Sequence, residues 1–206
     1  LGGAPPTVLP FLEDWESNNG VIQTNGNVYS AADYSWDYET DKPNEGRMRY
    51  GTNTYLPYAG SGAMTLDKFP NTGTYATNLV TLTIDLSGYT SSSDLELGFF
   101  WADHADEDQA DDKVWVRGSN TDTWVEIYDL DPVARPNNTY TQVSGLDIDA
   151  TLASASQTVS STFQVRFGQY DNSFTPGDGI TFDNISIDEV PPPSAPKLAS
   201  IEDEQS

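Results

Sequence analysis

The chain contains no cysteine and a single histidine, His104. Without thiols it cannot build a disulfide framework, a thiolate zinc site or a cysteine nucleophile. Its stability must therefore come from apolar burial and from any metal that binds. Small secreted eukaryotic domains usually carry disulfides, whereas exported bacterial proteins often do without them, so the composition favours a prokaryotic source.

Basic residues are also scarce. Nine lysines and arginines stand against 32 acidic residues, which gives a formal net charge of −23. The electrostatic field of so negative a chain repels phosphate backbones and anionic membrane surfaces, so nucleic acid is not an expected partner. The acid excess has two interpretations: carboxylates that solvate a halophilic or marine chain, or carboxylates that are partly neutralised by bound cations.

Signs of catalysis and of membrane insertion are missing. His104 has no partner in a recognisable triad pattern, and the chain lacks a glycine-rich phosphate loop. Acids are so numerous that a glycosidase pair does not stand out among them. No stretch approaches the roughly 18 apolar residues of a membrane-spanning helix. The sequence therefore predicts a non-catalytic protein without membrane insertion.

The chain is rich in apolar and polar residues that alternate with a period of two, as half-buried strands require. The clearest predicted strands are Leu79–Leu86, Asp94–Trp101, Lys113–Arg117, Trp124–Leu130, Thr162–Tyr170 and Gly179–Ile187, with weaker ones at Phe11–Glu16, Met48–Tyr50, Ala63–Asp67 and Tyr140–Asp149. Clusters of Gly, Asn, Ser, Asp and Pro between them predict turns. This pattern predicts an all-β, antiparallel β-sandwich of the jelly-roll type in a single domain.

The composition also divides the chain. We expect residues 1–10 to form an N-terminal extension and residues 11–188 to form the β-sandwich module. Residues 189–206 carry prolines and charges but no strand pattern, so they are predicted to be a Pro-rich linker or tail. Such ends fit a module strung within a longer protein.

An acidic loop joins two predicted strands between Ala102 and Lys113. Its acids are Asp103, Asp106, Glu107, Asp108, Asp111 and Asp112. Calcium accepts roughly six to eight oxygen ligands in flexible geometry, and mutual repulsion among the carboxylates favours a bound cation. The spacing is not that of an EF-hand, which has a glycine at the sixth loop position. Two readings stay open: a calcium site with ligands among Asp103, Asp106, Asp108 and Asp112, or a solvated acidic loop.

A second candidate calcium site pairs the two ends of the predicted module. Asp183 and Glu13 each share a strand face with apolar residues. A buried carboxylate must be hydrogen-bonded, ion-paired or metal-bound, because burial of a bare charge is costly. The first and last strands of a jelly roll are often neighbours, so Glu13 or Glu16, with Asp178 and Asp183, is predicted to clamp one structural calcium. The alternatives are that Glu16 lies on the opposite face and that Asp183 caps a turn.

Aromatic residues indicate a possible ligand surface. Trp115 lies between two core valines and is expected to face outward, as are Trp124 and Tyr128 in the next strand. Exposed aromatic rings stack on the flat faces of sugars, and Glu126 would reach sugar hydroxyls. The alternative is that a loop, a second layer or a neighbouring module covers these rings. The other tryptophans are expected to anchor the core or loops: Trp15, Trp36 and Trp101.

Several phrases resemble modules that recur in large exported bacterial proteins: FLEDWES, TLTIDLSG, LELGFFWADHADEDQADDKVWVRGSNTDTWVEIYDL and FGQYDNSFTPGDGITFDNISI. Those modules are similar to MAM-type and related concanavalin-like jelly rolls. Eukaryotic MAM domains carry disulfide cysteines that this chain lacks, so their adhesion partners are not carried over. The resemblance implies an accessory, adhesive or carbohydrate-binding unit, often with a structural cation near the first and last strands.

Three functions are consistent with these features. The first is a non-catalytic structural or adhesive module of a secreted or cell-surface protein, stabilised by calcium, with neighbouring protein modules or subunits as partners. The second is a carbohydrate-binding module of a secreted hydrolase, with glycans on the aromatic surface. The third is a glycosidase or lyase of jelly-roll type.

Overall fold

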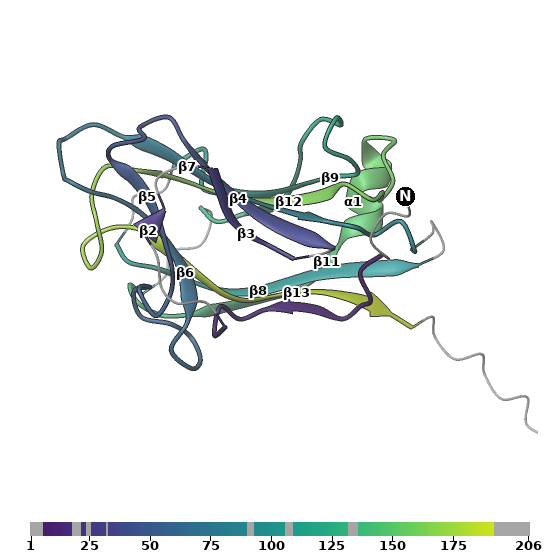
Figure 1. Cartoon of the computed structure of the whole chain (residues 1–206). Helices are drawn as coiled ribbons and strands as arrows, with labels where there is room; N and C mark the ends of the chain where they lie inside the picture. The colour runs from purple at the N-terminus through teal and green to yellow at the C-terminus, as the bar shows by residue number, and fades with distance from the viewer. Residues whose placement is uncertain are drawn as a thin grey trace, which may run out of the picture.

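The chain forms two antiparallel sheets stacked as two layers (Figure 1). The computed structural model describes residues 6–17, 22–23, 26–31, 33–89, 93–105, 109–131 and 136–191. The seven-stranded sheet has the order β11 (Thr141–Asp147), β8 (Asp94–Asp103), β13 (Ile180–Val190), β6 (Ala63–Lys68), β5 (Gly46–Gly51) and β2 (Ile22–Gln23), and β1 (Phe11–Glu13) pairs with β13. The six-stranded sheet has the order β10 (Val125–Asp129), β9 (Lys113–Arg117), β12 (Phe163–Asp171), β7 (Ala76–Ile84), β4 (Tyr34–Thr40) and β3 (Gly26–Ser30). The predicted all-β, antiparallel sandwich is confirmed.

The core lies between the two sheets and is built by the alternation seen in the sequence. In β9, for example, Val114 and Val116 are fully buried, whereas the residues between and beside them stay partly exposed. Aromatic side chains supply much of the core volume: Trp15, Trp36, Trp101, Tyr38, Phe99, Phe163, Phe167 and Phe182. The three tryptophans expected in the core or its anchoring loops are thus all buried.

The sequence pattern does not predict the one helix of the described residues. α1 (Ile148–Ser154) follows β11 directly, and the Asp147 carboxylate caps it by accepting a hydrogen bond from the Ala150 N–H at 2.7 Å. Ile148 and Leu152, one turn apart, are its buried residues. The helix contacts β8 of one sheet and β9 and β10 of the other, so it closes one side of the sandwich (Figure 1). A single apolar turn is too short to show a helical period against the surrounding strand pattern.

The two chain ends meet in the seven-stranded sheet. β1 pairs antiparallel with β13, so that Phe11 lies opposite Ile187 and Glu13 opposite Ile185. The first and last strands are therefore neighbours, as the jelly-roll prediction requires. In the described part of the chain, no helix is long and apolar enough to cross a membrane.

Candidate functional site

One row of outward side chains crosses the six-stranded sheet. The strand register places Trp115 of β9 beside Arg166 of β12. Arg166 in turn lies beside Thr81 of β7, and Thr81 lies beside Asp37 of β4. Neighbouring strands lie about 4.8 Å apart, so the row runs across the strands. It offers a ligand an aromatic ring, a cation, a hydroxyl and a carboxylate in succession.

Trp115 rests against the backbone of β12. A Cβ atom at Gly168 would lie 2.5 Å from Cζ3 of Trp115 and 2.8 Å from the carbonyl oxygen of Asp111. Glycine is therefore needed at this position for the indole to occupy its place on the sheet. The ring borders a groove of about 310 Å³ lined by Thr77, Leu79, Asp111, Trp115, Trp124 and Arg166.

Trp124 is the second aromatic wall of this groove, and two arginines contact it. The guanidinium carbons of Arg117 and Arg166 each lie 4.2 Å from the centroid of its ring. Both contacts are cation–π interactions, which hold the ring and the two cations together. Trp124 is therefore not a bare stacking surface, because its ring already serves the two guanidinium groups.

The two arginines have mainly neutral partners. Arg117 donates from Nε to Gln164 Oε1 at 2.6 Å and from Nη1 to the Asp122 carbonyl at 3.2 Å. Arg166 donates from Nε to Thr81 Oγ1 at 3.1 Å. Burial lowers the pKa of both guanidinium groups, although arginine stays charged throughout the physiological range.

A second groove of about 540 Å³ continues from the first, and Arg166 lines both. Polar residues of four strands dominate its lining: Asp37, Glu39, Thr40, Thr81, Arg117 and Gln164. The carboxylate of Glu39 lies 3.6 Å from Nη2 of Arg166. The outer face thus changes from aromatic beside Trp115 to polar beside Asp37.

The prediction that Tyr128 faces outward is wrong. The pairing of β10 with β9 shifts register between Glu126 and Tyr128, which sets Tyr128 opposite the buried Val114. A bulge of this kind reverses the alternation of faces. Tyr128 therefore packs against the core, edge-on to Phe99 at 5.7 Å. Glu126 does lie opposite Trp115, where it accepts a hydrogen bond from Lys113 at 2.7 Å.

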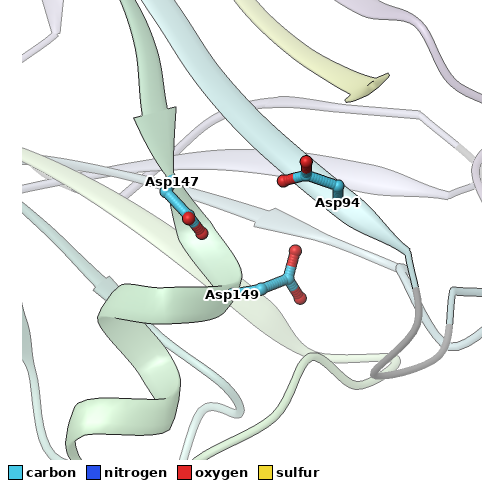
Figure 2. Close-up of side chains that lie close together, drawn as sticks. All are labelled: Asp94, Asp147 and Asp149. Atoms are coloured by element: carbon cyan, nitrogen blue, oxygen red, sulfur yellow. The ribbon is translucent and has the colours of Figure 1, made fainter. Parts of the chain in front are cut away.

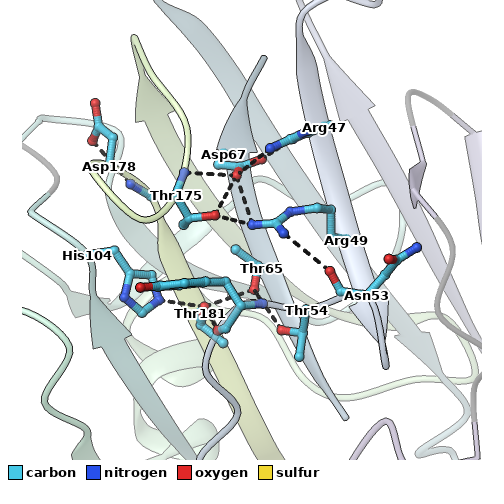
Figure 3. A network of polar contacts seen from close by, with 12 residues as sticks. Arg47, Arg49, Asn53, Thr54, Thr65, Asp67, His104, Thr175, Asp178 and Thr181 are labelled. Atoms are coloured by element: carbon cyan, nitrogen blue, oxygen red, sulfur yellow. Dashed lines mark hydrogen bonds and ion pairs between the residues drawn. The ribbon is translucent and has the colours of Figure 1, made fainter. Parts of the chain in front are cut away.

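The outer face of the seven-stranded sheet carries a closed polar network (Figure 3). Asp67, with no exposed surface, contacts Arg47 at 2.5 Å and Arg49 at 3.0 Å. Its carboxylate also accepts hydrogen bonds from the backbone N–H and the hydroxyl of Thr175. Every strong donor around this carboxylate is an internal group of the fold, so the network is structural.

His104 belongs to the same region and has no catalytic setting. It is fully buried, with Nδ1 2.8 Å from Asn138 Oδ1 and Nε2 2.7 Å from Thr181 Oγ1. Burial lowers the pKa of the imidazole, which keeps the ring neutral. Thr181 in turn bonds to Thr65 at 2.9 Å (Figure 3). The histidine is therefore a core hydrogen-bonding group.

The acidic loop turns one of its predicted ligands inward. Asp112 is buried and accepts hydrogen bonds from the N–H groups of Tyr170 at 2.8 Å and Gln109 at 3.0 Å. Burial raises the pKa of its carboxyl group to about 7. Asp103 is buried at the end of β8. Asp106 and Asp108 lie outside the described residues. The calcium prediction for this loop stays a prediction.

The residues of the predicted calcium clamp have different partners in the structure. Asp183 accepts hydrogen bonds from the N–H groups of Tyr58 at 2.9 Å and Ala59 at 3.1 Å. Glu16 accepts from the N–H groups of Ser61 at 2.8 Å and Gly62 at 2.7 Å. These two carboxylates share one loop, and burial raises the pKa of Asp183, with a further contribution from Glu16. Their described partners are backbone N–H groups and, for Glu16, also the Ser61 hydroxyl, which donates at 3.0 Å.

Glu13 and Asp178 have other partners. Glu13 is buried and accepts a hydrogen bond from the Trp15 N–H at 3.0 Å. Asp178 is buried beside Asp171, and the two carboxyl groups interact directly. Burial and the neighbouring Asp178 raise the pKa of Asp171 to about 8. Asp171 also accepts hydrogen bonds from Gln169 and from the Ser173 N–H, both at 2.7 Å.

A different group of acids lies at the N-terminus of α1. Asp94, Asp147 and Asp149 have carboxylate oxygens within 4.8 Å of one another, the only such group of three among the described residues (Figure 2). Asp147 caps the helix, and Asp149 accepts a hydrogen bond from the Leu95 N–H at 2.7 Å. Two of the three acids thus have structural hydrogen-bonding roles.

Comparisons with known proteins show which solved structures have a similar fold. No protein-family model matches the chain, and no curated protein matches its sequence. The K1 cleaved adhesin domain of Lys-gingipain from Porphyromonas gingivalis W83 is similar in structure, with a TM-score of 0.50 and 14% identity over 89% of this chain and 100% of that one. The family 11 carbohydrate-binding module of the cellulase Lic26A-Cel5E of Clostridium thermocellum gives a TM-score of 0.41 and 11% identity over 89% and 96%.

The enzymatically active domain of tailspike protein 4 of bacteriophage CBA120 also matches, with a TM-score of 0.46 and 16% identity over 75% of this chain. The chain spans 19% of the length of that tailspike structure. At such identities the likeness concerns the fold alone, since one fold serves many functions. The chain therefore shares its fold with the K1 adhesin domain, whose TM-score is 0.50.

Proposed function

We propose that the chain is a non-catalytic binding module of an exported protein, and that the groove between Trp115 and Trp124 binds carbohydrate. The observation that carries this proposal is the placement of Trp115. Its ring lies in a groove on a rigid sheet, and the fold keeps a glycine beneath it. A pre-organised aromatic ring binds a flat, poorly hydrated sugar face at little entropic cost.

The polar residues of the same surface suit the rest of a saccharide. Asp37 and Glu39 offer carboxylate acceptors in the adjoining groove, whereas the buried Gln164 and Thr81 accept hydrogen bonds from the arginines that line it. Convergent polar groups beside an apolar wall orient a ligand and give it specificity. A chain of sugars that crosses the strands would meet the aromatic wall first and these acceptors next.

The arrangement of acids supports a binding role without catalysis. A general acid for glycoside hydrolysis needs a raised pKa and a position beside the glycosidic oxygen. Among the described residues, the carboxyl groups with raised pKa values are Glu13, Asp112, Asp149, Asp171 and Asp183. None of them lines the two grooves on the six-stranded sheet.

A glycan array followed by titration calorimetry tests the proposal. Trp115→Ala should lower the affinity for any bound glycan by about tenfold or more. Tyr58→Ala is the matched control, because Tyr58 is an aromatic residue with 46% of its surface exposed but stacks on Phe100 of the other sheet. The proposal fails if no glycan binds, or if Trp115→Ala and the wild type bind equally well.

A second candidate function is adhesion to neighbouring modules or subunits. Tyr58 and Leu56, 46% and 44% exposed, form an apolar patch with Phe100 and Tyr140 on the seven-stranded sheet. Exposed apolar patches of this kind mark protein contacts. Self-association or module binding measured by analytical ultracentrifugation, and weakened by Tyr58→Ala, would favour this function over carbohydrate binding.

We further propose that calcium stabilises the fold. The support is the buried pair Asp171 and Asp178, since no ion pair of the described residues includes either acid. A ligand that binds only the folded state stabilises it by about 2.7 kcal/mol at one hundred times its dissociation constant. Melting should therefore rise with calcium and fall with chelator, and Asp178→Asn should shrink the difference. Identical melting curves in calcium and chelator would contradict this role.

A further inference from the structure

The cations of the molecule differ in how well they are paired. Four of them lie within 3.0 Å of a carboxylate: Arg47, Arg49, Lys68 and Lys113. Arg117 has no carboxylate within 4.0 Å among the described residues, and the closest one to Arg166 is Glu39 at 3.6 Å. Arg117 and Arg166 therefore hold positive charge that the fold itself leaves without a close counter-ion.

These two cations point to one ligand position. Both guanidinium carbons lie 4.2 Å from the centroid of the Trp124 ring, so they are at most twice that distance apart. Both arginines also line the second groove, so one acidic group of a ligand in that groove lies beside both of them. The Arg166 side chain is only 18% exposed, which means that it has lost most of its hydration. A partly dehydrated guanidinium gains strongly from a charge-assisted hydrogen bond to an anion.

A narrower inference rests on the carbohydrate-binding role proposed above. We infer that the groove takes an anionic saccharide, one with carboxylate or sulfate groups, and that Arg117 and Arg166 bind its acidic group while Trp115 stacks on a sugar ring. Arg166 lines both grooves, so it holds the acidic group at their junction. The sugar ring then lies over Trp115, on the side away from Gly168.

The acids around the groove limit where the anion binds. Asp111 lines the groove beside Trp115, and Asp37 and Glu39 line the second groove. Asp111 and Asp37 repel an anion from their sides of the grooves, whereas Glu39 lies 3.6 Å from Arg166 and competes with the anion for it. Glu39 is 64% exposed and free of close packing, so a ligand anion can displace it from Arg166. The net charge of −23 acts at long range, where salt screens it beyond about 8 Å.

Calorimetry with ligands that differ only in charge tests this inference. The probes are galacturonic-acid oligosaccharides and the same saccharides with methyl-esterified carboxyl groups. Sulfated galactan oligosaccharides and their desulfated forms make a second pair, which distinguishes sulfate from carboxylate. We expect one acidic form to bind at least about tenfold more tightly than its neutral partner, the scale of one charged hydrogen bond.

Variants then assign the charge recognition to residues. Arg117→Gln and Arg166→Gln should each lower the affinity for the acidic form about tenfold more than they lower the affinity for the neutral form. Lys113→Gln is the matched control, because it removes the same charge from the same strand face, at a residue held by Glu126 and outside the groove lining. Arg166→Lys keeps the charge and should have an intermediate effect. Melting curves confirm that each variant is folded.

The outcomes separate the two levels of the proposal. Equal binding of neutral and acidic saccharides would overturn the anionic preference and leave carbohydrate binding intact. A loss of affinity in Lys113→Gln as large as that in Arg166→Gln would also overturn it, since net charge would then explain the effect. No binding of any saccharide, neutral or acidic, would reject carbohydrate binding itself.

Discussion

The outer faces of the two sheets use arginine in opposite ways. On the seven-stranded sheet, Arg47 and Arg49 contact Asp67, a carboxylate with no exposed surface. On the six-stranded sheet, Arg117 and Arg166 contact an amide, a carbonyl, a hydroxyl and an aromatic ring at close range. The first pair is neutralised within the fold, whereas the second has Glu39, 3.6 Å from Arg166, as its one carboxylate within 4.0 Å among the described residues. On the binding role proposed above, pairing more than residue type separates a structural arginine from a binding one.

The surroundings of the two pairs sharpen this difference. The segment around Asn53 and Tyr55 lies over the paired arginines, since Arg49 donates to the Asn53 carbonyl and the Thr181 hydroxyl donates to the Tyr55 carbonyl (Figure 3). Around Arg166 the surface opens into two grooves. The side chains of Arg47, Arg49 and Arg166 are similarly buried, at 16%, 14% and 18% exposed, so the two faces differ in how charge is paired and in the grooves that Arg166 lines.

Removal of the Asp67 charge should have the largest effect on the free energy of unfolding. Asp67→Asn leaves two partly buried guanidinium groups without their carboxylate, and a broken buried pair costs about 3–5 kcal/mol. Urea unfolding should show this loss in the free energy of unfolding. The matched variant is Glu39→Gln, an acid on the outer face of the other sheet whose side chain is 64% exposed, which should cost far less. Equal losses in the two variants would remove the distinction between the faces.

A pH series tests the acids that lack such cations. Burial raises the pKa of Asp112 to about 7 and that of Asp171 to about 8. From pH 6.5 to 8 the folded protein therefore binds more protons than the unfolded chain, so its stability falls as the pH rises. In chelator we expect a loss of at least about 1.4 kcal/mol, the value of one pKa unit.

Two features keep this pH test specific. His104 has a lowered pKa, so it acts in the opposite direction, mainly below pH 6.5 where the unfolded chain takes up its proton. Asp171→Asn should flatten the dependence of stability on pH, because it removes the carboxyl group whose pKa is raised to about 8. Stability that rises between pH 6.5 and 8 in the wild type would show that these acids are ionised and compensated.

Local sequence patterns were sufficient for the fold and for part of the site. Alternation located most of the strands and the outward position of Trp115, because both depend only on neighbours along the chain, but it missed β2, β3 and β4. The inward turn of Tyr128 depends on a bulge against β9, which no local pattern encodes. Helix α1 was hidden because Ile148 and Leu152 form only one apolar turn.

The missed parts of the site depend on contacts between distant segments. Arg166 and Gly168 sit at outward positions of β12, a parity visible in the sequence, but their roles come from the register with β9. Likewise Asp178 was grouped with Asp183 by position along the chain, whereas its partner is Asp171. Pairing across strands and loops decides which charges stay free, and a single sequence does not contain that information.

The glycine beneath Trp115 gives a smaller test of the open face. Gly168→Ala should push the indole out of its position, because the added Cβ would lie 2.5 Å from the ring and 2.8 Å from a backbone oxygen. Affinity for the bound saccharide should fall about tenfold, although residue 168 offers no side chain to the ligand. Gly177→Ala, where the closest atom is 3.9 Å away, is the control for glycine replacement. Unchanged binding in Gly168→Ala would mean that the ring position does not matter.

The smallest effect is expected at Glu39, the loosely placed acid beside Arg166. At 3.6 Å and with 64% of its side chain exposed, it should contribute less than about 1 kcal/mol to stability. Glu39→Gln should nevertheless raise the affinity for an acidic saccharide a few-fold, because it removes the only carboxylate that competes for Arg166 among the described residues. A protein whose arginine was paired for structure would lose stability and gain no affinity. Calorimetry and urea unfolding on this one variant therefore measure both sides of the contrast between the two faces.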